Sequence, residues 1–532
     1  MTNEELIAKQ AAIIERLEKQ LNDTTKELKE TQLIIEDQKF QMEYMRQEIA
    51  MLKSRKFDRR SEQLDKQYPN LFNYDVFNEA EDEANEINEP IDIETGEPQT
   101  VTFEVKGTKK KNLINRLDKL QEVEIIHDLT DEEKICECGT TMVKIGETVT
   151  YKIKYVPAKL IKEKHIYSTY KCEECYKADI TNIVKTPYNL AFPKSMASSS
   201  LVANIITDKY AKYLPLYRQE KLFRNVGLDI SRANMSNCFL AGANILKPLV
   251  DIMYEDILKN DIVHMDETTL TVIKSLSDTC YMWGLFSSKY DKPIKLYFYK
   301  DNRRHENASE LLKGFKGYVI SDGYEAYNKV ESCINVNCWA HARRKYAEII
   351  KAFKGNLTSS LCLEGIKYID DLYKIEHMLE KNNASVEEIY NTRQKESKEI
   401  LDKYKLWLDK NYPTVPPKTA LGKAMAYSIN NFDNLSNYIL DGRLSLDNNL
   451  AERGMKNFVI GRKNFLFCFA ENGAHMSSVA YSIVETALAN NLNVFEYLTY
   501  VFDTLAKCDN NKDNLRKLVP YSNELPGYLR VK

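Results

Sequence analysis

The sequence has no stretch of about 18 uncharged apolar residues, which is the length that a helix needs to cross a membrane. Its N-terminus, MTNEELIAKQ, also lacks the basic region followed by an apolar run that marks a secretory signal. We therefore expect a cytoplasmic protein without a membrane partner. In that reducing compartment, the 11 cysteines are better explained as free thiols or metal ligands than as disulfides.

Net charge is nearly absent as well, because 75 basic and 78 acidic side chains leave a formal charge of −3. The field of the whole molecule therefore neither supports nor excludes a nucleic-acid partner, which must be argued from local basic patches. The 532 residues are 43% hydrophobic and 29% charged. This composition is typical of soluble globular proteins, and the length allows roughly three or four domains.

Proline and glycine are missing from residues 4–54, where an apolar side chain recurs at every seventh position. Seven successive heptads predict a coiled coil over residues 1–54 that forms a homodimer or a higher oligomer. The second core position of each heptad, three residues later, is polar in the middle of this helix. The alternative is one long helix that packs on its own protein. The repeat consists of Ile7, Ile14, Leu21, Leu28, Ile35, Met42 and Ile49.

A basic segment follows this helix, with five cations between Lys53 and Arg60. A dimer would present two copies of the segment to DNA phosphates, but the same cations also suit a solvated helix end. Residues 75–100 are acidic and have no sustained apolar period, so we assign residues 55–125 to this segment and a flexible linker. The candidate DNA contacts here are Arg55, Lys56, Arg59 and Arg60.

Four cysteines cluster between residues 136 and 175, at the two ends of a pair of alternating runs. Four thiolates are the ligand set of a structural tetrahedral Zn²⁺, and a small β-ribbon with little core would depend on that metal to fold. Residues 126–190 are therefore predicted to form a zinc-binding β-ribbon, the alternative being two unrelated reduced pairs. The ligands would be Cys136, Cys138, Cys172 and Cys175.

Residues 191–256 have a helical pattern. Within them, Gly227 followed by Ser231 as a helix cap resembles the turn and second helix of a helix-turn-helix, which would aim Arg232 at DNA. Such matches are common in helical proteins, so the alternative interpretation is structural packing.

From residue 257 the pattern changes to three hairpin strands, two further strands and a helix, which is the order of an RNase H-like mixed sheet. Asp266 lies inside an apolar strand, where an unpaired carboxylate is costly. Asp322 ends another strand beside Gly323, so the two carboxylates could share a divalent ion. Alternation along the first strand sends Glu267, the neighbouring acid, to the opposite face.

A third acid, Glu452, lies on a later helix with Asp447 as its predicted cap. Two Mg²⁺ or Mn²⁺ ions held by Asp266, Asp322 and Glu452 would activate an oxygen nucleophile and stabilise the leaving oxygen during attack on a phosphodiester. The alternative is that each acid is an ordinary surface or ion-paired residue. Candidate DNA contacts on the same helix are Asn449, Arg453, Arg462 and Lys463.

Residues 338–346, CWAHARRKY, place several basic side chains on one short helix after a strand. Contact with phosphates is one interpretation, and an amphipathic helix with a structural histidine is the other. The candidate contacts in this helix are His341, Arg343 and Arg344.

The fold class predicted from these patterns is multidomain α+β. The catalytic core would comprise residues 257–350 and 441–500, followed by a C-terminal tail at residues 501–532. Residues 351–440 are largely charged and helical, and are predicted to be an insertion into that core.

Four blocks, VHMDETTL, SDGYEAYN, CWAHARRKY and DNNLAERGMKNFVIGRKNFLF, resemble the signature blocks of the bacterial IS66-family insertion-sequence transposases. They occur in the family's order, with the long insertion in the expected gap, and the upstream segments extend the likeness over nearly the whole chain. The resemblance implies that Asp266, Asp322 and Glu452 are the catalytic DDE residues. It also implies terminal inverted repeats and target DNA as partners, small accessory proteins of the same element, and association with the bacterial nucleoid.

Two departures from the family pattern are visible. The first cysteine pair of the predicted zinc site is Cys136-x-Cys138, where many relatives have CxxC. Phe465 stands where Trp is common after GRKN. Intact acids at all three positions favour an active DNA transposase. The alternative is a catalytically inactive, transposase-derived DNA-binding regulator, and a third hypothesis is a zinc-ribbon scaffold that does not bind DNA.

Overall fold

The computed structural model describes residue 14, residues 16–32 and scattered positions up to 49, and residues 159–171, 183–186, 189–352 and 360–531. The chain divides into two compact units, residues 1–79 with 162–532 and residues 80–161. Only residues 159–161 of the second unit are described, so all other described residues belong to the first unit.

The described positions between residues 14 and 49 are helical, and their side chains are exposed. Apolar side chains of the predicted heptad repeat, such as Leu21 and Leu28, are among the exposed ones. An apolar stripe of this kind is what a coiled coil buries against a second helix. The dimerising coiled coil stays a prediction, because a partner helix is not part of this structure.

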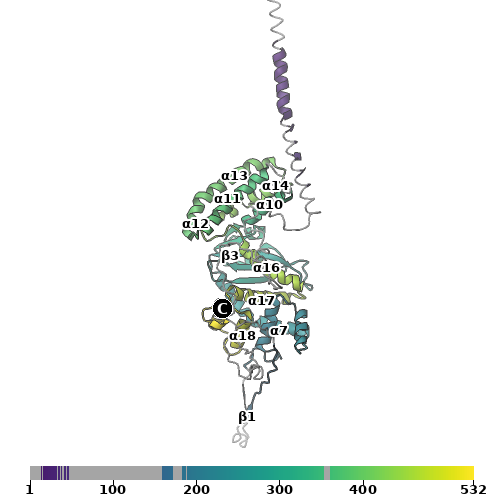
Figure 1. The fold of residues 1–532 in the computed structure, drawn as a ribbon, viewed down its shortest axis with the longest axis vertical. Helices are drawn as coiled ribbons and strands as arrows, with labels where there is room; N and C mark the ends of the chain where they lie inside the picture. Colours follow the sequence, from purple (N-terminus) through teal and green to yellow (C-terminus); the bar gives the residue numbers. More distant parts are fainter. Residues whose placement is uncertain are drawn as a thin grey trace, which may run out of the picture. The chain divides into compact units, whose positions relative to one another are not determined.

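A five-stranded mixed sheet forms the centre of the first unit, with the strand order β5-β4-β3-β6-β7 (Figure 1). The strands β3 (Ile262–Leu270), β4 (Cys280–Ser287) and β5 (Lys295–Lys300) are antiparallel neighbours. The strands β6 (Tyr318–Ser321) and β7 (Ile334–Asn337) continue the sheet in parallel with β3. This confirms the predicted mixed α+β architecture, while the RNase H-like classification stays a prediction.

Helices cover the sheet, and β4 is therefore buried along nearly its whole length. The helix α16 (Asn449–Phe465) packs on β3 and β4, and α17 (Glu471–Ala489) packs on β5. Behind α17 lie α7 (Arg232–Ile257) and α5 (Ser199–Tyr210), and α18 (Val494–Leu505) packs on α5. These elements share one large hydrophobic core.

A second hydrophobic core lies among the helices that follow β7 (Figure 1). Its main elements are α10 (Trp339–Ala352), α11 (Leu361–Lys381), α13 (Lys398–Asn411) and α14 (Ala420–Asn430). Two buried arginines form ion pairs beside this core, since Arg343 contacts Asp370 and Arg393 contacts Glu376, each at 2.6 Å. The described part of residues 351–440 is thus largely helical, and it shares this core with residues of β3, β6, β7 and α10.

Two further features lie upstream of the sheet. A short antiparallel ribbon of β1 (Thr169–Lys171) and β2 (Ile183–Lys185) falls within the segment predicted to bind zinc. The helix α6 (Leu216–Asn225) precedes α7, and the Ser231 side chain caps α7 by accepting the N–H of Asn234 at 3.2 Å, as the sequence predicts. The remaining α-helices are α8 (His305–Leu311), α9 (Glu325–Asn328), α12 (Val386–Thr392), α15 (Phe432–Ser436) and α19 (Lys512–Leu518).

Among the residues with described positions, no helix has both the length and the apolar character needed to span a membrane.

Candidate active site

Asp266 and Asp322 stand at neighbouring positions of the sheet. β3 and β6 are parallel, with Ile262 paired to Tyr318, so the same register continued for four residues brings Asp266 level with Asp322. Adjacent strands lie about 4.8 Å apart. Asp322 directly follows the last residue of β6, and Gly323 turns the chain there with a φ of +80°. Asp266 in the middle of β3 and Asp322 just beyond the end of β6 are thereby brought to the same level of the sheet.

The helix α16 covers the face of the sheet to which Asp266 points. Asp266 pairs directly with Gly284 on β4, and directly opposed residues of antiparallel strands point to the same face. A Cβ atom at Gly284 would lie 2.6 Å from the Sδ atom of Met455, so this glycine allows α16 to lie close to the strand. Glu452 lies one helical turn before Met455 on the same helix.

The three predicted acids influence one another electrostatically. Burial raises the pKa of Asp266 well above its ordinary value, and the charges of Glu267, Asp322 and Glu452 raise it further. Like charges in a buried region disfavour ionisation, whereas a bound cation would favour it. The charges of Asp322 and Glu452 thus reach Asp266, but the ligand atoms of these three acids do not all lie within 4.8 Å of one another.

Glu267, the acid next to Asp266, has a different environment. Its carboxylate is fully buried, accepts a hydrogen bond from the hydroxyl of Tyr327 and pairs with the guanidinium of Arg303. Burial raises the pKa of Glu267. The guanidinium of Arg303 also lies 3.7 Å from Oδ2 of Asp322 and 3.8 Å from the centre of the Tyr324 ring. Arg303 thus links Glu267 to the end of β6.

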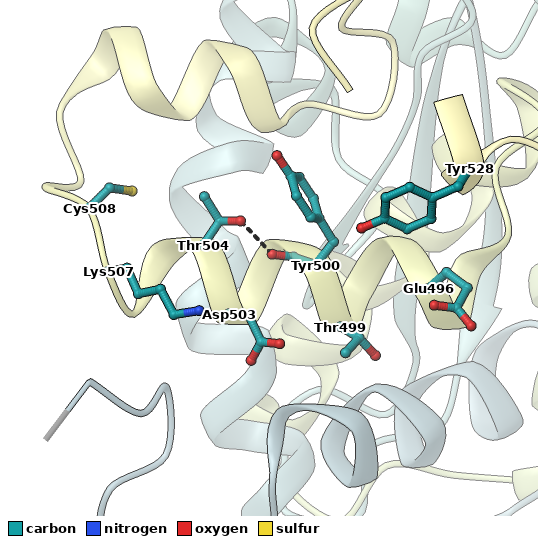
Figure 2. Close-up of a pocket in the computed structure, with 8 residues that line it drawn as sticks. All are labelled: Glu496, Thr499, Tyr500, Asp503, Thr504, Lys507, Cys508 and Tyr528. Atoms are coloured by element: carbon teal, nitrogen blue, oxygen red, sulfur yellow. Dashed lines mark hydrogen bonds between the residues drawn. The ribbon is translucent and has the colours of Figure 1, made fainter. Parts of the chain in front are cut away.

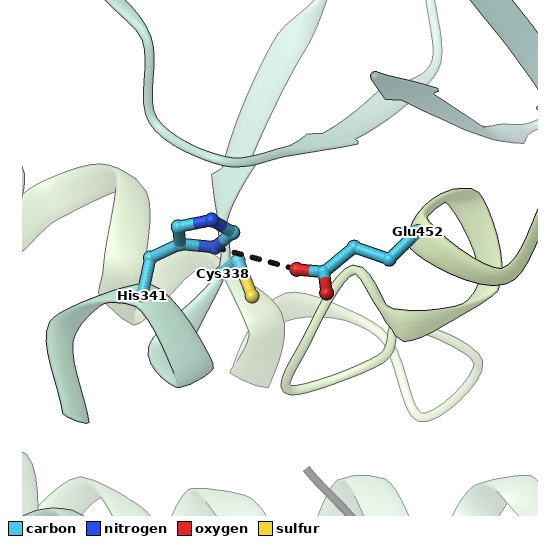
Figure 3. A group of neighbouring side chains, drawn as sticks. All are labelled: Cys338, His341 and Glu452. Atoms are coloured by element: carbon cyan, nitrogen blue, oxygen red, sulfur yellow. Dashed lines mark ion pairs between the residues drawn. The ribbon is translucent and has the colours of Figure 1, made fainter. Parts of the chain in front are cut away.

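Glu452 lies between two residues of α10. Its Oε1 is 3.7 Å from Nδ1 of His341 (Figure 3). Its Oε2 is 3.8 Å from the guanidinium of Arg344. Burial and the positive charge of Arg344 lower the pKa of His341 to about 4, so its imidazole is neutral at pH 7. Cys338, immediately before α10, lies beside both His341 and Glu452.

Asn448 fixes the start of the helix that carries Glu452. Its side chain is buried and donates to the carbonyl oxygen of Met265 at 2.8 Å, and its backbone N–H donates to Sγ of Cys338 at 3.2 Å. The next residue, Asn449, donates its backbone N–H to Asp447 at 3.2 Å and its amide to the same carboxylate at 3.0 Å. The N-cap of α16 is therefore Asn448, one residue after the predicted cap, and the carboxylate of Asp447 accepts the backbone N–H of the first helical residue.

The predicted DNA contacts differ in exposure. Arg453 and Lys463 are exposed on α16, Arg344 is about one-third exposed (37%), and Arg462 binds the hydroxyl of Thr268 at 3.0 Å. Arg232 is also exposed (66%) and pairs with Glu220 on α6 at 3.3 Å.

The structure contradicts the prediction that Arg343 contacts DNA. Its side chain is 1% exposed and forms its ion pair with Asp370 inside the protein, which leaves it no path to a phosphate. We therefore withdraw it from the candidate DNA contacts. The four zinc-ligand candidates, Cys136, Cys138, Cys172 and Cys175, lie outside the described residues. So do the basic residues Arg55, Lys56, Arg59 and Arg60.

A pocket of about 400 Å³ lies along α18 and contains none of the predicted site residues. Glu496 and Asp503 line it from the helix, and the ring of Tyr528 stands across from them (Figure 2). Lys507 also lines it, and none of the three predicted acids does, so this pocket is separate from the candidate active site.

Sequence patterns missed Cys338 and Arg303 as residues of the site, and they assigned His341 to DNA contact alone. Cys338 and His341 have the i, i+3 spacing of metal ligands at a helix start, and this signal was available in CWAHARRKY. Nothing in the sequence near Arg303 indicates its pairing with Glu267, 36 residues away. Asn448 and Asn449 are adjacent in the sequence, and only the fold shows that the side chain of Asn448 is the buried one.

Comparison with known proteins supplies the family. A model described as "Transposase IS66 family" matches residues 194–476, which is more than half of the chain. A second model, described as the zinc-finger binding domain of transposase IS66, matches residues 133–176.

Two similar proteins come from Sinorhizobium fredii (strain NBRC 101917 / NGR234). Uncharacterized protein y4hP is 26% identical over 411 residues, covering 73% of this chain and 73% of its own length. Uncharacterized protein y4jD is 28% identical over 413 residues, covering 74% and 78%. Since the first family model spans over half of the sequence, this chain belongs to the IS66 family of transposases.

Proposed function

We propose that this transposase cleaves and joins DNA at terminal inverted repeats through Asp266, Asp322 and Glu452. The observation that supports this proposal is the register of β3 with β6, which brings Asp266 level with Asp322, together with the packing of the helix that carries Glu452 on β3. Asp266 is buried in the sheet, and the charges of both other acids raise its pKa. A folded chain would be expected to neutralise such a cluster unless the cluster bound a cation.

The ligand chemistry supports Mg²⁺ or Mn²⁺, because all three side chains offer carboxylate oxygens. Two such ions, when bound, would activate the attacking oxygen and stabilise the leaving oxygen of a phosphodiester. The protein's own part is to hold the acids in place. The sheet fixes Asp266 and Asp322, and the buried side chain of Asn448 fixes the start of the Glu452 helix.

Basic side chains next to the acids suit a DNA backbone. Arg344 lies beside Glu452, and the exposed Arg453 and Lys463 project from the same helix as Glu452. We propose that these three residues contact phosphates near the scissile bond, where each cation would release counterions from DNA.

The other parts of the chain have supporting roles in this proposal. The N-terminal helices would pair two subunits as a coiled coil, so that both ends of the element are held together. The zinc segment would be folded by Zn²⁺ on its four cysteines, and the central sheet would be of the RNase H-like type. Small accessory proteins of the same element would join this complex.

A strand-transfer assay on inverted-repeat DNA with Mg²⁺ or Mn²⁺ tests the proposal. Asp266→Asn, Asp322→Asn and Glu452→Gln should each abolish cleavage and joining while leaving DNA binding intact. The control is Asp278→Asn, an exposed acid in the β3–β4 loop, which should remain active.

The two alternative functions give different results in the same experiment. DNA binding without cleavage by the unmodified protein would favour a catalytically inactive regulator. An absence of any salt-dependent DNA affinity would favour a scaffold that does not bind DNA.

A further inference from the structure

Cys338, His341 and Glu452 form a cluster with a different ligand chemistry from the three carboxylates. One ligand atom from each residue lies within 4.8 Å of the others, and no other such trio of His, Cys, Asp or Glu side chains occurs in the part of the chain that the structure describes. Cys338 immediately precedes α10 and His341 lies one helical turn later, so both face the same side, toward Glu452 on α16 (Figure 3).

The ligand set is thiol, imidazole and carboxylate. A mixture of sulfur, nitrogen and oxygen suits Zn²⁺ or Co²⁺, whereas Mg²⁺ prefers oxygen ligands alone. Three protein ligands also leave one tetrahedral position open for solvent. The cluster is therefore a poor magnesium site and a plausible site for a transition-metal ion.

Burial and hydrogen bonding prepare these atoms for a ligand. Cys338 is fully buried, and its Sγ accepts the backbone N–H of Asn448 at 3.2 Å, which holds the sulfur toward α16. Nδ1 of His341 is buried and makes no hydrogen bond to any described residue. The nearest carboxylate oxygen, Oε1 of Glu452, lies 3.7 Å away.

Only a small rearrangement would close the site. Bond lengths of about 2.3 Å to sulfur and about 2.0 Å to nitrogen place tetrahedral ligand atoms roughly 3.5 Å apart. The carboxylate of Glu452 would move toward Cys338, and the guanidinium of Arg344 would turn away. Arg344 is 37% exposed, so it can turn into solvent.

We propose that Cys338, His341 and Glu452 bind a thiophilic divalent ion such as Zn²⁺, and that this ion inhibits the enzyme by occupying Glu452. The inhibition rests on the proposed function, in which Glu452 holds a catalytic ion. Metal binding by the cluster does not depend on that function.

Co²⁺ titration of the full-length protein under reducing conditions tests the binding. The comparison is between the unmodified protein and Cys338→Ser, because any Co²⁺ taken up by the predicted zinc segment contributes equally to both. We expect the variant to bind one Co²⁺ fewer per chain, or to bind that ion at least about 10-fold more weakly. The absorption band of the thiolate–Co²⁺ bond should decrease together with the amount of bound Co²⁺.

Two further variants keep this test decisive. Cys362→Ser changes another fully buried cysteine, on α11, and should leave Co²⁺ binding unchanged. His341→Gln should weaken binding like Cys338→Ser, which gives a second measurement if the serine variant fails to fold. Equal stoichiometry and affinity in the unmodified protein, Cys338→Ser and His341→Gln would overturn the site.

Inhibition is tested by adding Zn²⁺ to the Mg²⁺-dependent strand-transfer reaction. Each protein is compared with its own zinc-free activity, and the zinc concentration that halves this activity should be at least about 10-fold higher for Cys338→Ser. Equal sensitivity of both proteins would overturn the inhibitory role. If the unmodified protein had no strand-transfer activity, the proposed function would fail, while the Co²⁺ measurement would still decide the metal site.

Discussion

His264 and Asn448 are joined inside the protein, with 3.1 Å between Nδ1 of the imidazole and Oδ1 of the amide. His264 lies on β3, two residues before Asp266, and Asn448 is the N-cap of α16. The same amide also donates to the carbonyl oxygen of Met265. These two hydrogen bonds couple the strand and the helix that carry two of the proposed catalytic acids.

Replacing Asn448 with alanine should therefore impair the enzyme and destabilise the fold. The substitution leaves buried polar atoms on His264 and Met265 without their partner, at a cost of about 1–3 kcal/mol in the free energy of unfolding. Strand-transfer activity should fall more than DNA affinity. The substitution would displace Asp266 and Glu452, whereas the exposed basic side chains proposed to contact DNA would keep their positions. Thermal unfolding and strand-transfer assays measure the two effects.

The control for this prediction is Asn464→Ala. Asn464 lies on the same helix and makes exposed hydrogen bonds to Arg218 and to the Ile460 carbonyl. Its replacement should change stability by no more than about 0.5 kcal/mol. Equal effects of the two substitutions would show that Asn448 has no special role.

Gly284→Ala should separate α16 from the sheet. The added methyl group would lie 2.6 Å from Sδ of Met455 and closer still to the ring of Phe286, so the helix or the ring must move. Overpacking of this kind costs about 1–3 kcal/mol. Because Gly284 pairs with Asp266, strand transfer should fall as well.

Gly473→Ala provides the matched comparison. Gly473 lies in the first turn of α17, and a Cβ atom there would meet nothing within 4 Å among the described residues. Alanine should stabilise this helix by about 0.5–1 kcal/mol. A similar melting temperature for both alanine variants would contradict the close approach at Gly284.

The sequence predicts the elements of this fold better than their arrangement. Apolar runs predict the strands of the sheet because those residues are buried, and Ser231 predicts the start of α7 because its side chain satisfies a free N–H. The alignment of Asp266 with Asp322 depends on the register of β3 with β6. No local pattern encodes that register, because it depends on how two distant strands pair in the folded protein.

The sequence shows which residues of the candidate site are charged, but it does not show which of them are buried. Arg343 and Arg344 are adjacent, but neighbouring residues on a helix point about 100° apart. Arg343 therefore turns inward to Asp370, whereas Arg344 lies beside Glu452. The prediction that both contact DNA is wrong for Arg343 because the helical insertion that buries it has no recognisable contact pattern.

Arg303 is expected to matter through Glu267. Arg303→Met should destabilise the protein by about 2 kcal/mol, since it leaves the buried carboxylate of Glu267 without its cation. Adding Glu267→Gln removes that charge but can keep the hydrogen bond from Tyr327, so the double variant should regain much of the loss. Urea unfolding of the single and double variants measures the coupling, and additive effects would exclude it.

The final prediction concerns a buried acid away from the site, Glu485 on α17. Its carboxylate is fully buried, accepts a hydrogen bond from Asn457 at 2.8 Å and lies 3.5 Å from the ammonium of Lys295. Burial raises the pKa of Glu485, and Lys295 opposes this shift without cancelling it. The folded protein therefore keeps this proton to higher pH than the unfolded chain does.

The sign of the pH effect follows from that difference. Below the ordinary pKa of a glutamate, about 4.3, both states hold the proton, and Glu485 contributes its full stability. As the pH rises toward the raised pKa of the folded state, the unfolded chain releases its proton first, and the stability falls. Glu485→Gln does not titrate, so its stability relative to the unmodified protein should increase from pH 4 to pH 7. Urea unfolding followed by tryptophan fluorescence at both pH values measures this difference. The control for the loss of one carboxylate is Glu471→Gln, which changes an exposed residue of the same helix. If Glu485→Gln and the unmodified protein differed by the same amount at pH 4 and pH 7, the raised pKa of Glu485 would be refuted.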